Sequence, residues 1–154
     1  LVALRALPVE GSAGDEGRLF LHRILGQRIA PAPILYPAFV GQAAAWSGGI
    51  PRTFLQLIAD AATHARLRQR GPWPTDDDLK DAAVEMRESF RRILLPGDTD
   101  ALRAADGTDA REMELARKIR LLAHGALLER MSDHGPMMEP HPLVRALVAP
   151  APHA

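Results

Sequence analysis

A hard break near the middle of the chain constrains its fold more than any other feature. Gly71, Pro72, Trp73 and Pro74 follow one another. A helix does not continue through such a segment, because proline removes an amide donor and its ring clashes with the preceding turn. The connector is also too short to act as a long flexible tether. We therefore expect two small helical units with their boundary at residues 71–74.

The composition limits the classes of protein that the chain can belong to. Its 154 residues are 47% apolar and 25% charged, which is typical of a soluble globular protein. Basic and acidic residues number 19 each, so nucleic-acid binding would need a local basic patch. The absence of cysteine excludes a disulfide framework and a thiolate metal site. No stretch has the layout of a signal peptide or a membrane span, and we expect a cytoplasmic protein.

Helical periodicity dominates the segment before the break. Apolar spacing predicts a helix that begins near Asp15, a second from about Tyr36 to Trp46, and a third that opens at Pro51. Proline suits that first helical position because its missing N–H would have no partner there.

The first nine residues have a different pattern. Leu1–Val9 predicts a single strand, which is not stable without partner strands. Position 1 is Leu rather than Met, so we expect the chain to be a fragment of a longer protein whose sheet lies upstream.

The segment after the break predicts three helices and a hairpin. Thr75 is expected to cap the first helix, and the third is expected to bury Leu115 and Ile119. The expected elements are a helix from Thr75, a short helix at 99–105, a helix from about Asp109 to His124, strands at 126–131 and 136–139, and a last helix at 142–148. The order of three helices and a hairpin is that of a winged helix.

One short motif has the chemistry of an anion site. It is Ser47-Gly48-Gly49-Ile50-Pro51-Arg52, at the start of the third helix. The two glycines permit a tight left-handed turn, and the proline fixes φ for the first helical turn. The amides of a helix start carry about half a positive charge. Arg52 adds donors that match a phosphate, so the motif is suited to the γ-phosphate of a nucleotide.

These six residues resemble the sensor 2 motif of AAA+ and STAND-type P-loop ATPases, in which S-G-G-x-P-R opens a lid helix directly after the nucleotide-binding core. The tail is similar to the closing wing of several bacterial members, which end in a hairpin and an H-P-L-V run like His141–Val144 here. Two positions depart from the family. Ile50 stands where a polar residue is frequent, and Met137 and Met138 stand where an aromatic residue is frequent.

The resemblance implies a mainly α fold, with a helical lid followed by a winged helix and one small β-hairpin. It divides the chain into the end of an upstream ATPase core (1–14), the lid (15–71), the winged helix (75–148) and a disordered tail (149–154). The nucleotide-sensing residues that it implies are Ser47, Gly48, Gly49, Pro51 and Arg52. The implied function is to couple the nucleotide state of the core to conformation or to binding of an oligomer neighbour or partner protein.

The same resemblance assigns ATP and magnesium to the parent protein. The chain has no G-x-x-x-x-G-K-[ST] motif and no strand that ends in paired acidic residues. We therefore expect no catalytic residue in the chain and no cofactor bound by the fragment alone.

The alternative function is that of a free-standing winged-helix DNA-binding protein. A winged helix places its third helix in the major groove, and the basic residues expected there are Arg111, Arg117, Lys118 and Arg120. The same helix carries Asp109, Glu112 and Glu114, whereas a DNA-reading surface is usually clearly basic. Contact with a partner is therefore the favoured role of these residues, and nucleic acid is weakly supported.

Two further kinds of site receive little support. Ser47 lies in a run close to the G-x-S-x-G nucleophile elbow, but Ala45 replaces the first glycine and a helix is expected before it. A capping serine is the better interpretation. None of the six histidines forms a short metal-ligand pair such as H-E-x-x-H, so no metal site is expected.

Overall fold

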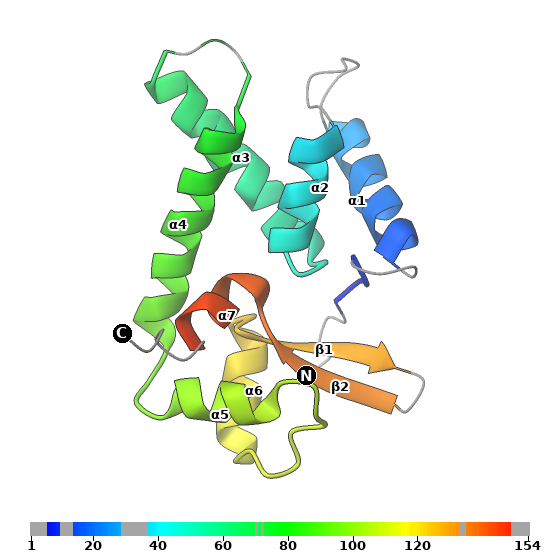
Figure 1. Ribbon diagram of the computed structural model, residues 1–154, viewed down its shortest axis with the longest axis vertical. Coiled ribbons are helices and arrows are strands. Elements are labelled where there is room, and N and C mark those ends of the chain that lie inside the picture. The colour runs from blue at the N-terminus through cyan, green and yellow to red at the C-terminus, as the bar shows by residue number, and fades with distance from the viewer. Residues whose placement is uncertain are drawn as a thin grey trace, which may run out of the picture. The chain divides into compact units, whose positions relative to one another are not determined.

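The computed structural model describes residues 6–9, 14–28, 37–69, 71, 73–132 and 135–148. These residues are mainly helical, with one small antiparallel hairpin near the C-terminal end, as the sequence predicts (Figure 1). The elements are α1 (Gly14–Arg28), α2 (Pro37–Trp46), α3 (Pro51–Leu67), α4 (Asp76–Ile93), α5 (Asp98–Ala105), α6 (Leu115–Ala123), β1 (Leu127–Ser132), β2 (Gly135–Pro140) and α7 (Pro142–Val148).

The chain divides into two compact units. The N-terminal unit is Leu7–Met86, and the C-terminal unit contains Ala6 and the described residues from Arg87 onward. The division falls inside α4, whereas the break at Gly71–Pro74 predicts a domain boundary at residues 71–74. The predicted tail at 149–154 lies outside the described residues.

Helices α1, α2 and α3 pack against one another in the N-terminal unit (Figure 1). Their contact surfaces follow helical spacing, since Phe54, Leu57, Ile58 and Ala61 on α3 are all buried. Pro51 stands in the first turn of α3, as predicted. The core of this unit is therefore built mainly from one face of α3 and the facing sides of α1 and α2.

The start of α4 is fixed to the end of α3. Thr75 and Asp78 form a reciprocal cap: the Thr75 amide and hydroxyl donate to the Asp78 carboxylate at 2.9 and 2.7 Å, and the Asp78 amide donates back to Thr75 Oγ1 at 3.4 Å. Arg68 donates to Asp78 at 3.2 Å and also pairs with Asp81. These bonds explain why the first half of α4 belongs to the N-terminal unit despite the break before it.

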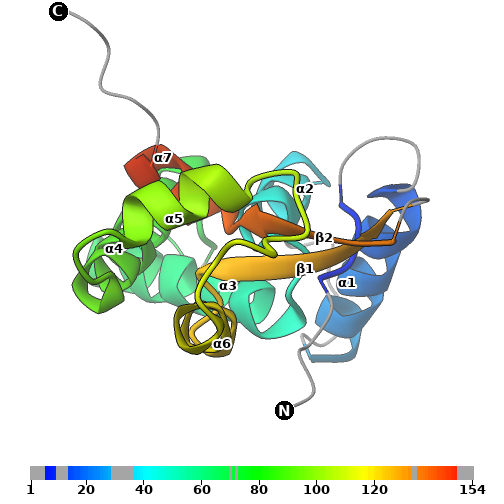
Figure 2. The same ribbon diagram turned by 90° about the horizontal axis from the view of Figure 1, so that it is seen from below.

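The C-terminal unit is organised around the hairpin. β1 and β2 pair from Leu127 opposite Pro140 to Ser132 opposite Gly135. Helices α5 and α7 lie side by side next to β2, and α6 contacts β1 (Figure 2). The core cluster joins side chains from every one of these elements: Leu102, Ala105, Ala110, Leu121, Ala126, Leu127, Met138, Val144 and Val148.

The prediction of a helix from Asp109 to His124 is wrong at its start. The helix begins only at Leu115, and residues 106–114 form an irregular loop. Thr108 pairs with Met138 beside β2, and Ala110 has a left-handed backbone with φ of 50°. Both features prevent a helix from starting at Asp109, because they commit this backbone to the sheet edge and to a non-helical conformation.

The predicted strand at Leu1–Val9 is not present over the part that the structure describes. Residues 6–9 have no regular secondary structure. The Ala6 amide donates to the Glu129 carbonyl of β1 at 3.2 Å. Residues 1–5 lie outside the described residues.

Candidate functional site

The segment Ser47–Arg52 forms a tight turn that ends α2 and starts α3. Gly48 and Gly49 both have left-handed backbones, with φ of 62° and 77°. The Ile50 amide donates to the Ser47 carbonyl at 3.2 Å, and the Phe54 amide donates to the Ile50 carbonyl at 2.9 Å as the first bond of the new helix. The Gly-Gly pair thus has the left-handed conformation that the sequence predicts, because residues with a Cβ rarely adopt it.

Ser47 holds the turn together from inside. Its side chain is fully buried, its hydroxyl donates to the Ala44 carbonyl at 2.7 Å, and it accepts the Gly49 amide at 3.2 Å. Helix α2 runs directly into Ser47, so the strand that a nucleophile elbow requires is replaced by a helix. Ser47 is therefore a structural residue of the turn, whereas the N-cap position of α3 is Ile50.

The start of α3 presents amide donors that have no partner within the helix. Ile50 is the N-cap residue and its side chain makes no capping bond. The first amides of a helix have no partner within the helix, so those of Arg52 and Thr53 are available to an anion. The Arg52 side chain is exposed, and within the described part of the chain it has neither a hydrogen bond nor an ion pair. Its guanidinium is therefore available for a ligand.

The four basic residues considered for nucleic-acid or partner contact are mostly engaged within the protein. Arg117 and Arg120 pair with Asp98 of α5, and Lys118 donates to the Asp109 carbonyl at 2.9 Å. Arg111 is the most exposed of the four, with 87% of its side chain accessible, and it pairs with Asp109. The structure therefore brings Arg117 and Arg120 together and leaves Arg111 apart from them.

Asp98 is the residue that organises these cations, and the sequence analysis missed it. It is fully buried, accepts two bonds from Arg120 at 2.7 and 2.6 Å, and accepts the Leu95 amide at 2.7 Å. Burial by itself raises the pKa of this carboxyl. The Arg120 and Leu95 hydrogen bonds and the charges of Arg120 and Arg117 outweigh burial and lower the pKa below its ordinary value.

The outer side of α6 is apolar rather than basic. Leu115 and Ile119, one turn apart, are 70% and 43% exposed, which contradicts the prediction that they are buried. Helix α6 turns its arginines towards Asp98 and leaves these two side chains outward. A surface of this kind is unusual for a helix that enters a DNA groove and more typical of protein contact.

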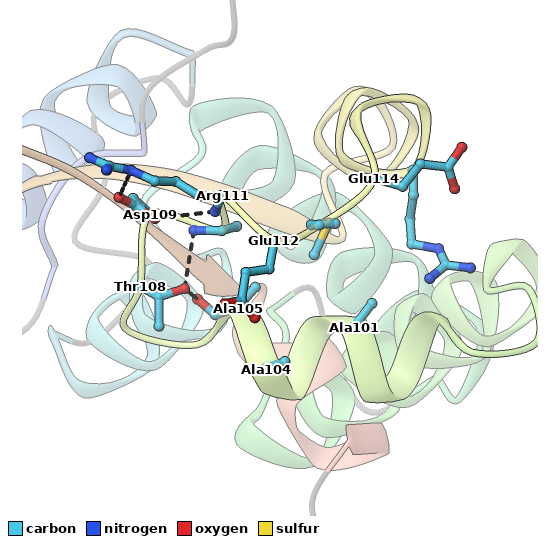
Figure 3. Close-up of a pocket in the computed structure, with 11 residues that line it drawn as sticks. Ala101, Ala104, Ala105, Thr108, Asp109, Arg111, Glu112 and Glu114 are labelled. Atoms are coloured by element: carbon cyan, nitrogen blue, oxygen red, sulfur yellow. Dashed lines mark hydrogen bonds and ion pairs between the residues drawn. The ribbon is translucent and has the colours of Figure 1, made fainter.

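A hollow of about 630 Å³ lies between α5 and the loop before α6 (Figure 3). Its α5 side consists of Ala101, Ala104 and Ala105, and charged loop residues, among them Asp109, Arg111 and Glu112, line the other side. No histidine, serine or cysteine is among its lining residues. The hollow does not include the turn at residues 47–52.

His141, in the tail motif, has a structural role at the start of α7. It is fully buried, its Nδ1 accepts the Leu143 amide at 3.2 Å, and its carbonyl accepts the Val144 amide at 2.8 Å. Its ring packs on Phe90 with centroids 4.8 Å apart. The histidine therefore caps α7 and fixes the end of the hairpin against α4.

Comparison of the chain with protein-family models, with curated proteins and with solved structures found no match. Among the described residues, no helix combines the length and the apolar character needed to cross a membrane.

We predict that Gly49→Ala destabilises the protein by at least about 2 kcal/mol, because alanine is strained at a left-handed position and its Cβ meets backbone. An added Cβ would lie 1.9 Å from the Leu7 carbonyl oxygen. Gly41→Ala, in the middle of α2 and with no atom within 4 Å of its Cβ, is the matched control. It is expected to be neutral or stabilising by up to about 1 kcal/mol in chemical denaturation. Equal effects of the two changes would contradict the geometry of the turn.

We expect Asp98→Ala to cost about 3 kcal/mol of unfolding free energy, because it leaves Arg117 and Arg120 without their buried acceptor. Asp100→Ala on the same helix is the control. Asp100 is 78% exposed and pairs with Arg103 one turn away, so its loss is expected to cost less than about 1 kcal/mol. A comparable loss in both variants, measured by urea unfolding, would exclude an organising role for Asp98.

The lowered pKa of Asp98 also predicts a pH dependence. A carboxyl with a lower pKa in the folded state contributes stability above its unfolded pKa, and this contribution is lost as the pH falls through the folded pKa. The stability difference between the wild-type protein and Asp98→Asn is therefore expected to narrow as the pH falls from about 5 towards 2. A difference that stays constant over this range in denaturation titrations would show that the pKa of Asp98 is the same in the folded and unfolded states.

Proposed function

We propose that this chain is the nucleotide-sensing lid and winged-helix module of a larger, cytoplasmic P-loop ATPase. The observation that carries the proposal is the turn at Ser47–Arg52. A buried serine and two left-handed glycines place an exposed arginine in the first turn of α3, beside helix amides that have no partner within the helix. This is the arrangement that the S-G-G-x-P-R motif would need to respond to a phosphate.

The donor set of this turn fits an anionic phosphate better than a metal ion or an acyl substrate. The helix start contributes amide dipoles, and Arg52 contributes a fixed fork of N–H donors. Ser47 is committed to the Ala44 carbonyl and is not available as a nucleophile. The role that follows for Arg52 is to stabilise charge on a phosphate that other residues hold.

ATP with magnesium would supply the transferable phosphoryl group and its counter-charge in the parent protein. Residues 1–154 contain no P-loop sequence that could cradle the phosphates. On this proposal the chain does not hydrolyse ATP by itself. Its own contribution is to position Arg52 and the α3 amides. A movement of the start of α3 would also move the helices that pack on it.

The order of α4, α5, α6 and the hairpin supports the winged-helix part of the proposal. The outward Leu115 and Ile119 favour a protein partner or an oligomer neighbour as the contact of that domain. The alternative, a free-standing DNA-binding protein, is less well supported. Arg117, Lys118 and Arg120 already have acceptors within the protein.

The proposal predicts that, in the full-length protein, Arg52→Ala lowers ATP turnover by about a hundredfold or more, because arginines that contact a transferring phosphate have effects of that size. The unfolding free energy is expected to change by less than about 1 kcal/mol, since the buried face of α3 is untouched. Arg66→Ala, an exposed arginine in the last turn of the same helix, is the control and is expected to leave turnover unchanged.

Steady-state turnover at saturating ATP and thermal unfolding of both variants provide the test. Unchanged turnover in Arg52→Ala would remove this arginine from the mechanism and reduce the motif to a helix start. A loss of turnover that is matched by Arg66→Ala would indicate a general effect of charge rather than a sensor.

A further inference from the structure

The peptide at residues 7–9, which we call the strap, is held between α1 and the turn at residues 47–49. The Leu7 amide donates to the Gly49 carbonyl at 3.2 Å. Arg18 of α1 donates to the Val9 carbonyl at 2.5 Å, and Val9 is almost completely buried. The strap is therefore hydrogen-bonded to the turn through Leu7 and to α1 through Val9.

Glycines form the surfaces on which the strap lies. An added Cβ at Gly49 would lie 1.9 Å from the Leu7 carbonyl oxygen, and one at Gly17 would lie 1.9 Å from the Pro8 carbonyl oxygen. At Gly14 the nearest backbone atom, the Val9 carbonyl carbon, would be 2.6 Å away. Separations below 3 Å to backbone atoms are not tolerated, so each of these positions accepts only glycine while the strap stays in place.

Gly17 is otherwise unfavourable for a helix. Glycine in a helix interior is less stable than alanine, because it loses more backbone entropy on folding. Gly17 lies inside α1, where alanine would favour the helix. The close approach of Pro8 gives a physical reason for the glycine at this position.

We infer that Gly17 and Arg18 are positioning residues for the start of α3, acting through the strap. A shift of the strap moves Leu7, Leu7 is bonded to Gly49, and Gly49 lies three residues before Arg52. A displacement of residues 7–9 therefore changes the geometry of the turn that positions Arg52. Only the consequence for nucleotide sensing rests on the proposed function; the mechanical link is a property of the chain itself.

Gly17→Ala tests the link without any nucleotide. The added Cβ displaces Pro8, and the amides of Leu7, Ile50 and Phe54 are expected to exchange with solvent about tenfold faster or more, because a local opening exposes them. Gly26→Ala on the same helix is the control, since its Cβ has no atom within 4 Å. It is expected to leave these three exchange rates unchanged. Amide exchange by NMR gives the rate at each residue.

A second pair of variants covers the case in which Gly17→Ala does not fold. Arg18→Ala removes the bond to Val9 and keeps the glycine surfaces, so a smaller change in the same direction is expected. Arg23→Ala, an exposed arginine of α1, is its control. If Arg18→Ala, and Gly17→Ala where it folds, leave the exchange of Ile50 and Phe54 at the wild-type rate, the inference is wrong. That result would not contradict the proposed role of Arg52, because the turnover of Arg52→Ala tests that role separately.

Discussion

A buried aspartate at the start of a helix, held by arginine from another helix, organises each unit of this protein. Asp78 at the start of α4 binds Arg68 at the end of α3, and Asp98 at the start of α5 binds Arg120 of α6. Both aspartates have fully buried side chains. A buried carboxylate is costly unless it is paired and hydrogen-bonded, so these contacts fix the helices that supply the arginines. The packing within each unit depends on this requirement.

Local signals in the sequence were sufficient to predict most of the helices and strands. Pro51, the Thr75 cap and Gly135 mark two helix starts and the second strand of the hairpin, because each acts through backbone geometry within a few residues. The left-handed turn at Gly48 and Gly49 was predictable for the same reason. The part of the candidate site that lies in one continuous segment could thus be identified from its residues.

Features that depend on distant partners could not be predicted in this way. The loop at 106–114 exists because Thr108 pairs with Met138, thirty positions later in the chain, so the helical pattern around Asp109 is overridden. The exposure of Leu115 depends on which face of α6 turns towards Asp98. The role of Gly17 follows from the approach of Pro8, and a lone glycine in a helical pattern carries no sign of such a neighbour.

The hydrogen bond between Lys118 and the loop before α6 makes the two lysines of the chain differ in reactivity. The sequence contains two lysines, Lys80 and Lys118. Lys80 is 63% exposed and pairs with Asp77 three residues before it, whereas the Lys118 amine donates a hydrogen bond to the Asp109 carbonyl of the loop. An amine in a hydrogen bond of this kind reacts with acylating reagents only after the bond opens. The extent of acylation of Lys118 relative to Lys80, measured by mass spectrometry, therefore reports how often this loop opens. Lys80 is the internal standard on the same chain.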